Sequence, residues 1–375
     1  MSRKKIKIAL TGGGTGGHIT PLVAVLRQLN KLTDNLKFVY IGPTRNLKGL
    51  LKKENINVWP LFTGRLRRYL TIKAMFLNSI DFFKILFGFL QAIIYLIIYR
   101  PNIIFSKGGY GSFPTIVWAW IFRIPTIAHE SDSIPGATNK LLARFATKIV
   151  TSFPGEYKNF SPKKLVCLGT PIRDMTTDKQ DAKTIIKIVG ERPVIFITGA
   201  SQGAAQINHL VLKNLEVLLK KYEIIHQVGD RNYKKIEREI KKLSISTQEY
   251  HLYAFLDENQ MKAAYNIASL VVSRASSTNI FEIAALGRPS ILIPLPTSAS
   301  GHQLKNAQIY EKAGACIVLD PFSVTPNQLL NTINQLMANK QRLQTMSEAA
   351  LRFSKPHAAR DIAKLILKTV DDKQK

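Results

Sequence analysis

Cysteine is scarce in this sequence: only Cys167 and Cys316 occur among its 375 residues. Two cysteines so far apart exclude a disulfide-rich scaffold and a zinc site made of cysteines alone, and they indicate a reducing compartment. Metal-ligand spacing is lacking as well. His129, Glu130 and Asp132 form the nearest cluster of suitable ligands, but no second histidine stands at ligand spacing from them. We therefore expect no metal site and no cofactor.

Acidic residues are also few. The chain has 25 Asp and Glu against 53 Lys and Arg, a formal net charge of +28. A basic excess of this size indicates an anionic partner, which could be nucleic acid, acidic lipid or a phosphorylated substrate. The basic residues are scattered, and no nucleic-acid-binding motif occurs. We therefore expect no nucleic acid partner.

Long hydrophobic runs are limited to one. The N-terminal run Ile6–Leu10 is shorter than the ~7–15 residues of a secretion signal and predicts a first β-strand. Phe82–Ile98 is nearly all apolar but includes Lys84 and Gln91. Because a membrane span needs about 20 apolar residues, we favour a buried helix of an α/β domain here. A helix lying on the membrane surface is the alternative, and a true span is the least favoured interpretation.

Basic residues precede this apolar segment. Cations beside exposed aromatic residues are typical of a helix that lies on anionic lipid, although a solvated basic face beside a core helix would give the same pattern. The candidate membrane contacts are Arg67, Arg68, Lys73, Phe76, Phe82 and Phe83.

Strand-like apolar runs alternate with helical patterns along nearly the whole chain. The helical patterns include Thr20–Leu32, with Thr20 as N-cap and Pro21 as first helical residue, Ala204–Leu219 and Asn279–Leu286. This alternation predicts an α/β fold with parallel sheets and crossover helices. The expected strands are Lys5–Leu10, Lys37–Ile41, Asn57–Leu61, Ile103–Phe105, Thr126–His129, Lys148–Thr151, Val194–Thr198, Glu223–Gln227, Tyr250–Phe255, Leu270–Ser273, Ser290–Pro294 and Cys316–Leu319.

One arrangement occurs twice: a strand, a glycine-rich turn and a helix, at Ile8–Leu29 and again at Val194–Leu219. Each opening is typical of a Rossmann-like domain. We expect two such domains, residues 1–167 and 168–351, that face each other across a ligand-binding cleft.

The first glycine-rich turn, Thr11–His18, allows a ligand to approach the backbone closely. It matches G-x-G-x-x-G, but no acid follows the second strand as a nicotinamide site would require. His18 is the strongest proton-transfer candidate, because histidine titrates near working pH. It could act as a general base, or it could only order the loop.

The second turn, Thr198–Ala205, lacks the lysine of a Walker A motif but could hold a diphosphate through its amides and Ser201. A tight turn of small residues is the alternative. Arg173 could reach a phosphate or be a surface arginine. Glu282, expected at a helix start, could accept both hydroxyls of a ribose or be there because the helix dipole favours a carboxylate.

Six ordered motifs together resemble the MurG family of bacterial N-acetylglucosaminyltransferases, over nearly the whole chain. They are Gly13–His18, Gly108–Ser112, His129–Gly136 with Asn139 and Lys140, Gly199–Ala204, Glu282–Pro289, and His302 and Gln303 with Asn306 and Ala307.

The resemblance implies a GT-B glycosyltransferase fold in which the N-terminal domain holds a lipid acceptor and the C-terminal domain holds a UDP-sugar. Residues 352–375 would cross back onto the first domain. Leu256 would meet the uracil, Glu282 the ribose, and His302 and Gln303 the sugar. The other implied donor contacts are Thr15, Gly16, Gly17, Arg173, Ser201, Gln202 and Gly203, and the implied acceptor-side residues are Gly109, Tyr110, His129, Glu130, Asp132 and Asn139.

Two positions depart from the family pattern. Ser131 and Asp132 stand where many relatives have Gln-Asn, and Ala275–Ser277 stands where many have Ser-Gly-Ala. These changes leave the acceptor-side role of Asp132 and the phosphate contacts of the second loop open.

The resemblance implies an inverting transfer of N-acetylglucosamine from UDP-N-acetylglucosamine to the 4-hydroxyl of lipid-linked muramyl pentapeptide, at the cytoplasmic side of the cell membrane. His18 would be the catalytic base. Two alternatives are open: a transferase that acts on diacylglycerol, and a non-catalytic membrane protein that binds UDP-sugars.

Overall fold

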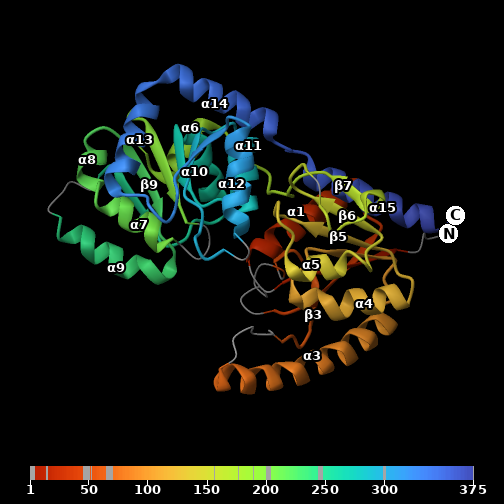
Figure 1. The fold of residues 1–375 in the computed structure, drawn as a ribbon. Coiled ribbons are helices and arrows are strands. Elements are labelled where there is room, and N and C mark those ends of the chain that lie inside the picture. Colours follow the sequence, from red (N-terminus) through yellow and green to blue (C-terminus); the bar gives the residue numbers. More distant parts are fainter. Residues whose placement is uncertain are drawn as a thin grey trace. The chain divides into compact units, whose positions relative to one another are not determined.

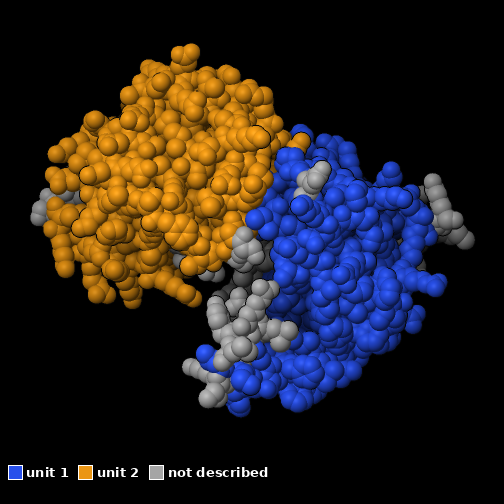
Figure 2. Space-filling view, in the orientation of Figure 1, with its two compact units in different colours: residues 1–173, 357–375 blue, residues 174–356 orange. Residues whose placement is uncertain are grey.

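The computed structural model describes the chain except residues 1–4, 14–15, 45–50, 52, 65–70, 156, 176, 189, 200–203, 244–247, 299–300 and 375, and describes only the backbone of 16–18, 72–74 and 374. The chain divides into two compact units, drawn in blue and orange in Figure 2. Unit 1 comprises residues 1–173 and 357–375, and unit 2 comprises residues 174–356.

Unit 1 contains a seven-stranded parallel sheet in the order β3-β2-β1-β4-β5-β6-β7. The chain moves outward from β1 to β3, and then returns to the other side of β1 to build β4 through β7. The order therefore reverses between β1 and β4, where open α/β sheets bind ligands beyond the carboxyl ends of their strands. The strands are β1 Ile6–Thr11, β2 Leu36–Gly42, β3 Asn57–Pro60, β4 Ile103–Ser106, β5 Thr126–Glu130, β6 Lys148–Thr151 and β7 Leu165–Cys167.

Unit 2 repeats this plan with a six-stranded parallel sheet in the order β10-β9-β8-β11-β12-β13. Its order reverses between β8 and β11, so β8 holds the same position in this sheet as β1 does in the sheet of unit 1. The strands are β8 Val194–Thr198, β9 Glu223–Gln227, β10 Tyr250–Tyr253, β11 Leu270–Ser273, β12 Ser290–Leu292 and β13 Cys316–Val318.

Helices cover both faces of the unit 1 sheet (Figure 1). α1 and α15 pack on one face, where Ile362 and Ile366 of the C-terminal helix are completely buried beside Leu22 and Leu26. α3 and α4 pack on the other face. The helices of this unit are α1 Gly16–Leu32, α3 Ile72–Tyr99, α4 Phe113–Ile121, α5 Ala137–Leu142 and α15 Ala358–Gln374, with short 3-10 turns η1 Tyr110–Ser112 and η2 Pro162–Lys164.

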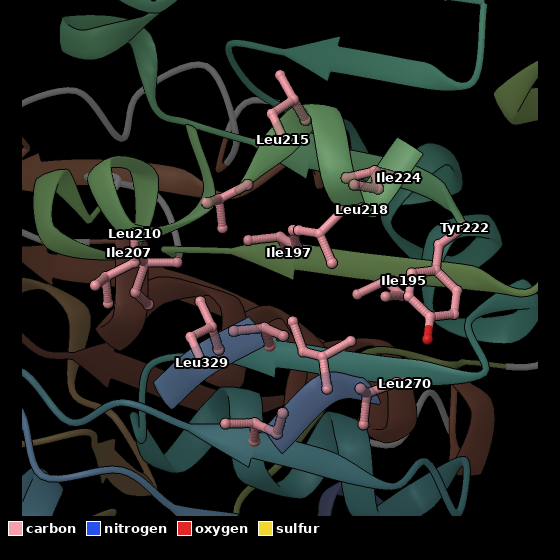
Figure 3. Close-up of a cluster of buried hydrophobic side chains, with 14 of the residues drawn as sticks. Ile195, Ile197, Ile207, Leu210, Leu215, Leu218, Tyr222, Ile224, Leu270 and Leu329 are labelled. Atoms are coloured by element: carbon pink, nitrogen blue, oxygen red, sulfur yellow. The ribbon is translucent and has the colours of Figure 1, made fainter. Parts of the chain in front are cut away.

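The core of unit 2 forms where helices pack on its central strands. In Figure 3, Ile195 and Ile197 of β8 lie among side chains from α7, α8 and α13, including Leu210, Leu218 and Leu329. The helices of this unit are α6 Lys179–Ile186, α7 Ala205–Leu212, α8 Leu215–Leu219, α9 Asp230–Lys241, α10 Glu258–Ile267, α11 Ser277–Ala285, α12 His302–Lys312, α13 Pro326–Ala338 and α14 Lys340–Phe353.

Three local expectations are wrong. α1 begins at Gly16, so Thr20 is no N-cap and Pro21 lies inside the helix; proline at the first helical position is a preference and not a rule. The expected helix over 204–219 is two helices, because the Asn214 side chain donates to the Leu210 and Pro326 carbonyls at the break. α11 begins at Ser277, which places Glu282 in its second turn.

The favoured interpretation of the apolar segment, a buried helix, is also wrong. α3 is the one helix among the described residues that is long and apolar enough to cross a membrane, yet only 17% of its most apolar stretch is buried. A helix that is hydrophobic on all sides is usually buried in a protein core, so the composition of α3 alone favours burial. Its exposed large side chains are Met75, Phe76, Ile80, Phe82, Phe83, Leu86, Phe87, Leu90, Ile94, Ile97 and Ile98.

One narrow stripe fixes α3 to unit 1. Asp81, Gly88, Ala92 and Leu96 are buried at spacings of seven, four and four residues, which places them on one side of the helix. The small residues allow close approach, and the Trp118 indole of α4 donates to the Phe89 carbonyl at 2.9 Å. We call the surface formed by the exposed apolar side chains of α3, from Met75 to Ile98, the α3 face; no element among the described residues covers it.

A buried histidine links the strands of unit 2 to α7. The His226 ring lies 2.9 Å from the Tyr250 hydroxyl through Nδ1 and 3.0 Å from the Asn208 Oδ1 through Nε2. Nε2 therefore donates to Asn208, and Nδ1 accepts from Tyr250. Burial lowers the pKa of His226 from 6.5 to about 3.

This histidine predicts a loss of stability in acid. In the unfolded chain this histidine binds a proton below pH ~6.5, whereas in the folded protein it binds one only near pH 3. Acid therefore favours the unfolded state. The contribution of His226 to the free energy of unfolding is complete above pH ~6.5 and is lost as the pH falls from there toward 3. At pH 5 the free energy of unfolding of unit 2 should be about 2 kcal/mol lower than at pH 7 from this group. Urea unfolding followed by circular dichroism at both pH values measures the difference.

The variant His226→Gln should reduce this difference by about 2 kcal/mol, since glutamine does not titrate. His209→Gln, at an exposed position of α7, should leave it unchanged. An equal pH dependence in wild type and His226→Gln would show that His226 is not the responsible group.

Candidate functional site

The carboxyl edge of the unit 1 sheet carries two glycine-rich turns at its switch point. The first follows β1 and runs directly into α1, whose first three residues are Gly16, Gly17 and His18. Amides at such a helix start attract anions, because they have no partner within the helix. Thr15 lies outside the described residues, and so does the side-chain geometry of His18.

The second turn follows β4. Gly108 and Gly109 have φ values of +75° and +83°, a region that other residues rarely adopt. The Ser112 hydroxyl donates to the Gly109 carbonyl at 2.8 Å and closes the turn. A Cβ on Gly111 would collide with Pro43 and would lie 2.9 Å from the Gly12 carbonyl oxygen, so the two turns pack directly on each other. Tyr110 is exposed at this edge.

The loop after β5 is organised by Glu130. Its carboxylate accepts hydrogen bonds from the Asp132 amide at 2.9 Å, the Gly136 amide at 3.1 Å and the Asn139 side chain at 2.8 Å. Three donors on one side chain hold the loop closed on itself. The structure therefore brings together four predicted acceptor-side residues, His129, Glu130, Asp132 and Asn139.

Lys107 is a buried cation beside this loop that the sequence analysis missed. Its Nζ lies 2.7 Å from the His129 Nδ1, and its side chain is almost completely out of solvent. Burial lowers the pKa of Lys107 to about 8, against the opposite effect of the Glu130 and Asp132 carboxylates. Burial, and then Asp132, raise the pKa of Glu130 to about 7, opposed by its hydrogen bonds and by Lys107.

Two more buried groups extend this cluster toward the end of unit 1. The His129 Nε2 lies 3.0 Å from the Gly169 carbonyl oxygen, and the Thr170 hydroxyl donates to the Ser152 Oγ at 2.7 Å. Lys107 lies two residues after the end of the expected strand Ile103–Phe105, and a polar residue close to a strand end is the signal that could have identified it. The same signal applies to Ser152, which directly follows the expected strand Lys148–Thr151, whereas nothing in the sequence pattern singles out Thr170.

The corresponding edge of unit 2 contains the turn after β8 and the turn after β11. Ser201, Gln202 and Gly203 lie outside the described residues, and α7 begins immediately after them with Ala204 as a cap that contributes no side-chain hydrogen bond. After β11, Ser276 caps α11 by accepting from the Asn279 amide. Burial lowers the pKa of Arg274 in this turn.

The remaining predicted donor residues lie on α11, on α12 and after β10. Glu282 is 2% exposed, and the Gln303 side chain accepts from the Leu295 amide at 3.0 Å. His302 begins α12. Leu256 is 1% exposed, so its side chain is a core group, whereas the preceding Phe255 is exposed.

Two further findings concern predicted residues. Arg173 is the last residue of unit 1 before the chain enters unit 2. Arg67 and Arg68 lie outside the described residues, as does the side chain of Lys73, whereas Phe76, Phe82 and Phe83 belong to the α3 face.

Within the described ranges, His, Cys, Asp and Glu side chains form no group of three that could hold a metal ion.

Comparison with known proteins identifies the family. Residues 8–151 match the glycosyltransferase family 28 N-terminal domain, and residues 194–366 match its C-terminal domain. The chain is 35% identical over 342 residues to the UDP-N-acetylglucosamine–N-acetylmuramyl-(pentapeptide) pyrophosphoryl-undecaprenol N-acetylglucosamine transferase of Clostridium tetani, covering 90% of this chain and 92% of that protein. The chain belongs to this transferase family.

A second relative in this N-acetylglucosamine transferase family, enzyme 2 of Bacillus anthracis, is 35% identical over 344 residues, with 90% of this chain and 94% of that protein covered. The crystal structure of Acinetobacter baumannii MurG has the same fold, with a TM-score of 0.72 at 24% identity over 97% of this chain and 99% of that chain. These matches confirm the expected α/β fold with two Rossmann-like domains and the expected family. The protein is a glycosyltransferase.

Proposed function

We propose that this protein transfers N-acetylglucosamine from UDP-N-acetylglucosamine to the 4-hydroxyl of undecaprenyl-diphosphoryl-N-acetylmuramoyl-pentapeptide, with inversion at the anomeric carbon. The product would be the lipid-linked disaccharide precursor of peptidoglycan. The observation that carries this proposal is 35% identity to transferases of that name over about 90% of the chain. The glycine-rich turns at both sheet switch points support it, since such turns bind diphosphate groups.

The donor would bind at the carboxyl edge of the unit 2 sheet. There residues 201–203 precede the N-terminus of α7, whose amides attract an anion. We assign the ribose to Glu282, the sugar to His302 and Gln303, and the uracil to the backbone of Leu256. Arg173 would add a positive charge at the diphosphate, together with Thr15, Gly16 and Gly17 of the first turn.

The reaction would need one proton acceptor and one site for growing negative charge. His18 would remove the proton of the acceptor hydroxyl while its oxygen attacks the anomeric carbon. The bond from that carbon to the phosphate oxygen breaks, and its electron pair leaves with UDP. Backbone amides, Ser201 and Arg173 would stabilise the charge that develops on the diphosphate.

The acceptor is a membrane lipid, and two features of unit 1 support peripheral attachment at the cytoplasmic side of the cell membrane. The α3 face is a continuous apolar surface on a helix whose other side is fixed to the unit. Unit 1 also has 31 basic and 9 acidic residues, net +22, whereas unit 2 has 22 and 16, net +6. Apolar burial and attraction to anionic lipid both contribute to interfacial binding.

Transfer of labelled N-acetylglucosamine tests the proposal directly. The purified protein should release UDP and label the lipid-linked muramyl pentapeptide in anionic vesicles, and it should label neither diacylglycerol nor vesicles without acceptor. Labelling of diacylglycerol alone would indicate a different lipid-directed transferase. Donor binding without any transfer would indicate a non-catalytic UDP-sugar-binding protein.

A further inference from the structure

Lys107 stands at the point where the unit 1 sheet reverses its strand order. It is the first residue after β4, and its amide donates to the Thr11 carbonyl at the end of β1. Its side chain is 2% exposed. A cation out of solvent is costly unless other groups compensate its charge. The groups around Lys107 therefore indicate what it holds in place.

The first of these groups is His129. An ammonium has donors only, so Lys107 donates to the His129 Nδ1 at 2.7 Å. The remaining ring proton is then on Nε2, which donates to the Gly169 carbonyl at 3.0 Å. Gly169 lies just after β7, four residues before unit 1 ends at Arg173. The proton on Lys107 thus sets the tautomer of His129. The His129 ring in turn holds Gly169, in the segment that leads from unit 1 to unit 2.

The second group is the Glu130 carboxylate, which attracts Lys107 electrostatically. The Lys107 charge favours the ionised form of Glu130, and that form is the stronger acceptor for the Asp132 and Gly136 amides and for the Asn139 side chain. Asn139 in turn packs on Gly108, where a Cβ would have no room. Through His129, Glu130 and Asn139, the Lys107 ammonium therefore acts on the loop after β4, on the loop after β5 and on the segment around Gly169 that leads out of unit 1.

We propose that Lys107 is a positioning residue for the transfer reaction, because its ammonium holds His129 and Glu130 in the geometry that shapes the two acceptor-side loops. This inference rests on the proposed function, in which those loops bind the lipid-linked acceptor. A methionine would fill nearly the same space as the lysine but has no donor and no charge. A role limited to filling space would survive that replacement, whereas a role in positioning would not.

Kinetics of Lys107→Met test the proposal. With saturating UDP-N-acetylglucosamine, kcat/KM for the acceptor should fall about 10- to 100-fold, because small displacements of positioning loops cost this much. The KM for the donor should stay within about twofold, since the residues assigned to it lie mainly in unit 2. An equal loss for donor and acceptor, or no loss, would overturn the proposal.

Lys7→Met is the matched control. Lys7 belongs to β1 of the same sheet and its ammonium donates to the Tyr99 carbonyl at 3.0 Å, but it lies at the amino end of the strand. Its replacement should leave both kinetic constants unchanged. If Lys107→Met does not fold, Lys107→Gln serves instead, because it removes the charge and keeps a side-chain donor.

Hydrogen exchange separates this inference from the proposed function, since it needs no activity. In Lys107→Met the Asp132 and Gly136 amides, which donate to Glu130, should exchange at least about 10-fold faster, and in Lys7→Met they should not. Unchanged protection in Lys107→Met would refute the positioning role even in an active enzyme. Faster exchange in a protein that transfers no sugar would instead refute the proposed function and leave the structural link established.

Discussion

Replacing His18 by alanine is expected to lower kcat about 10²- to 10⁴-fold, the usual contribution of a general base. The affinity for UDP should remain nearly unchanged, because an imidazole that receives the acceptor proton contributes mainly in the transition state. His18 is the third residue of α1, directly after the first glycine-rich turn. Steady-state kinetics and calorimetric titration with UDP measure the two quantities.

The alternative role of His18, ordering the turn, predicts a different pattern. A disordered turn would weaken UDP binding together with turnover, because the turn would contribute amides to the diphosphate. His209→Ala, an exposed histidine of α7, is the control for loss of an imidazole elsewhere and should behave as wild type. Turnover of His18→Ala close to wild type would remove this residue from the mechanism.

Substitution of the α3 face should have the second largest effect. The triple variant Phe83→Ser, Phe87→Ser and Leu90→Ser replaces three side chains that are each more than half exposed. Each substitution removes about 1 kcal/mol or more of the free energy gained when an apolar side chain is buried in lipid. The partition coefficient onto anionic vesicles should therefore fall about 100-fold or more. Because these side chains contact solvent in the protein, the thermal unfolding temperature should change little. Vesicle sedimentation measures the partition.

Phe322→Ser provides the matched control, because Phe322 is 77% exposed but belongs to unit 2. Its replacement should leave sedimentation unchanged. Added salt should weaken binding of the wild type, since it screens the basic excess of unit 1. A triple variant that sediments with vesicles as well as the wild type does would exclude the α3 face as the contact.

Much of the secondary structure could be predicted because local patterns specify it. The expected strands Val194–Thr198, Glu223–Gln227 and Leu270–Ser273 have the observed bounds, since each is a short apolar run between turn residues. β7, a three-residue strand at the edge of the unit 1 sheet, was missed. The helix break at Asn214 was missed because one of its carbonyl partners, Pro326, is 112 residues away.

Some residues of the candidate site could be predicted from the sequence and others could not, for the same reason. Glycine-rich turns, His18 and the His129–Glu130 pair could be found because each motif is contiguous in the sequence. The buried cluster around Lys107 could not, because its members come from β5 and from the segments that follow β4, β6 and β7. Only the order of the strands brings them to one edge of the sheet.

The sequence by itself determined the alternation of strands and helices, the two turns that begin the domains and the family. These follow from short-range periodicity and from glycine positions, which depend on neighbouring residues alone. The tertiary structure decided which side of α3 is covered and which cation compensates Glu130. Burial and charge compensation depend on residues distant in sequence, and only the folded sheet sets which of them meet.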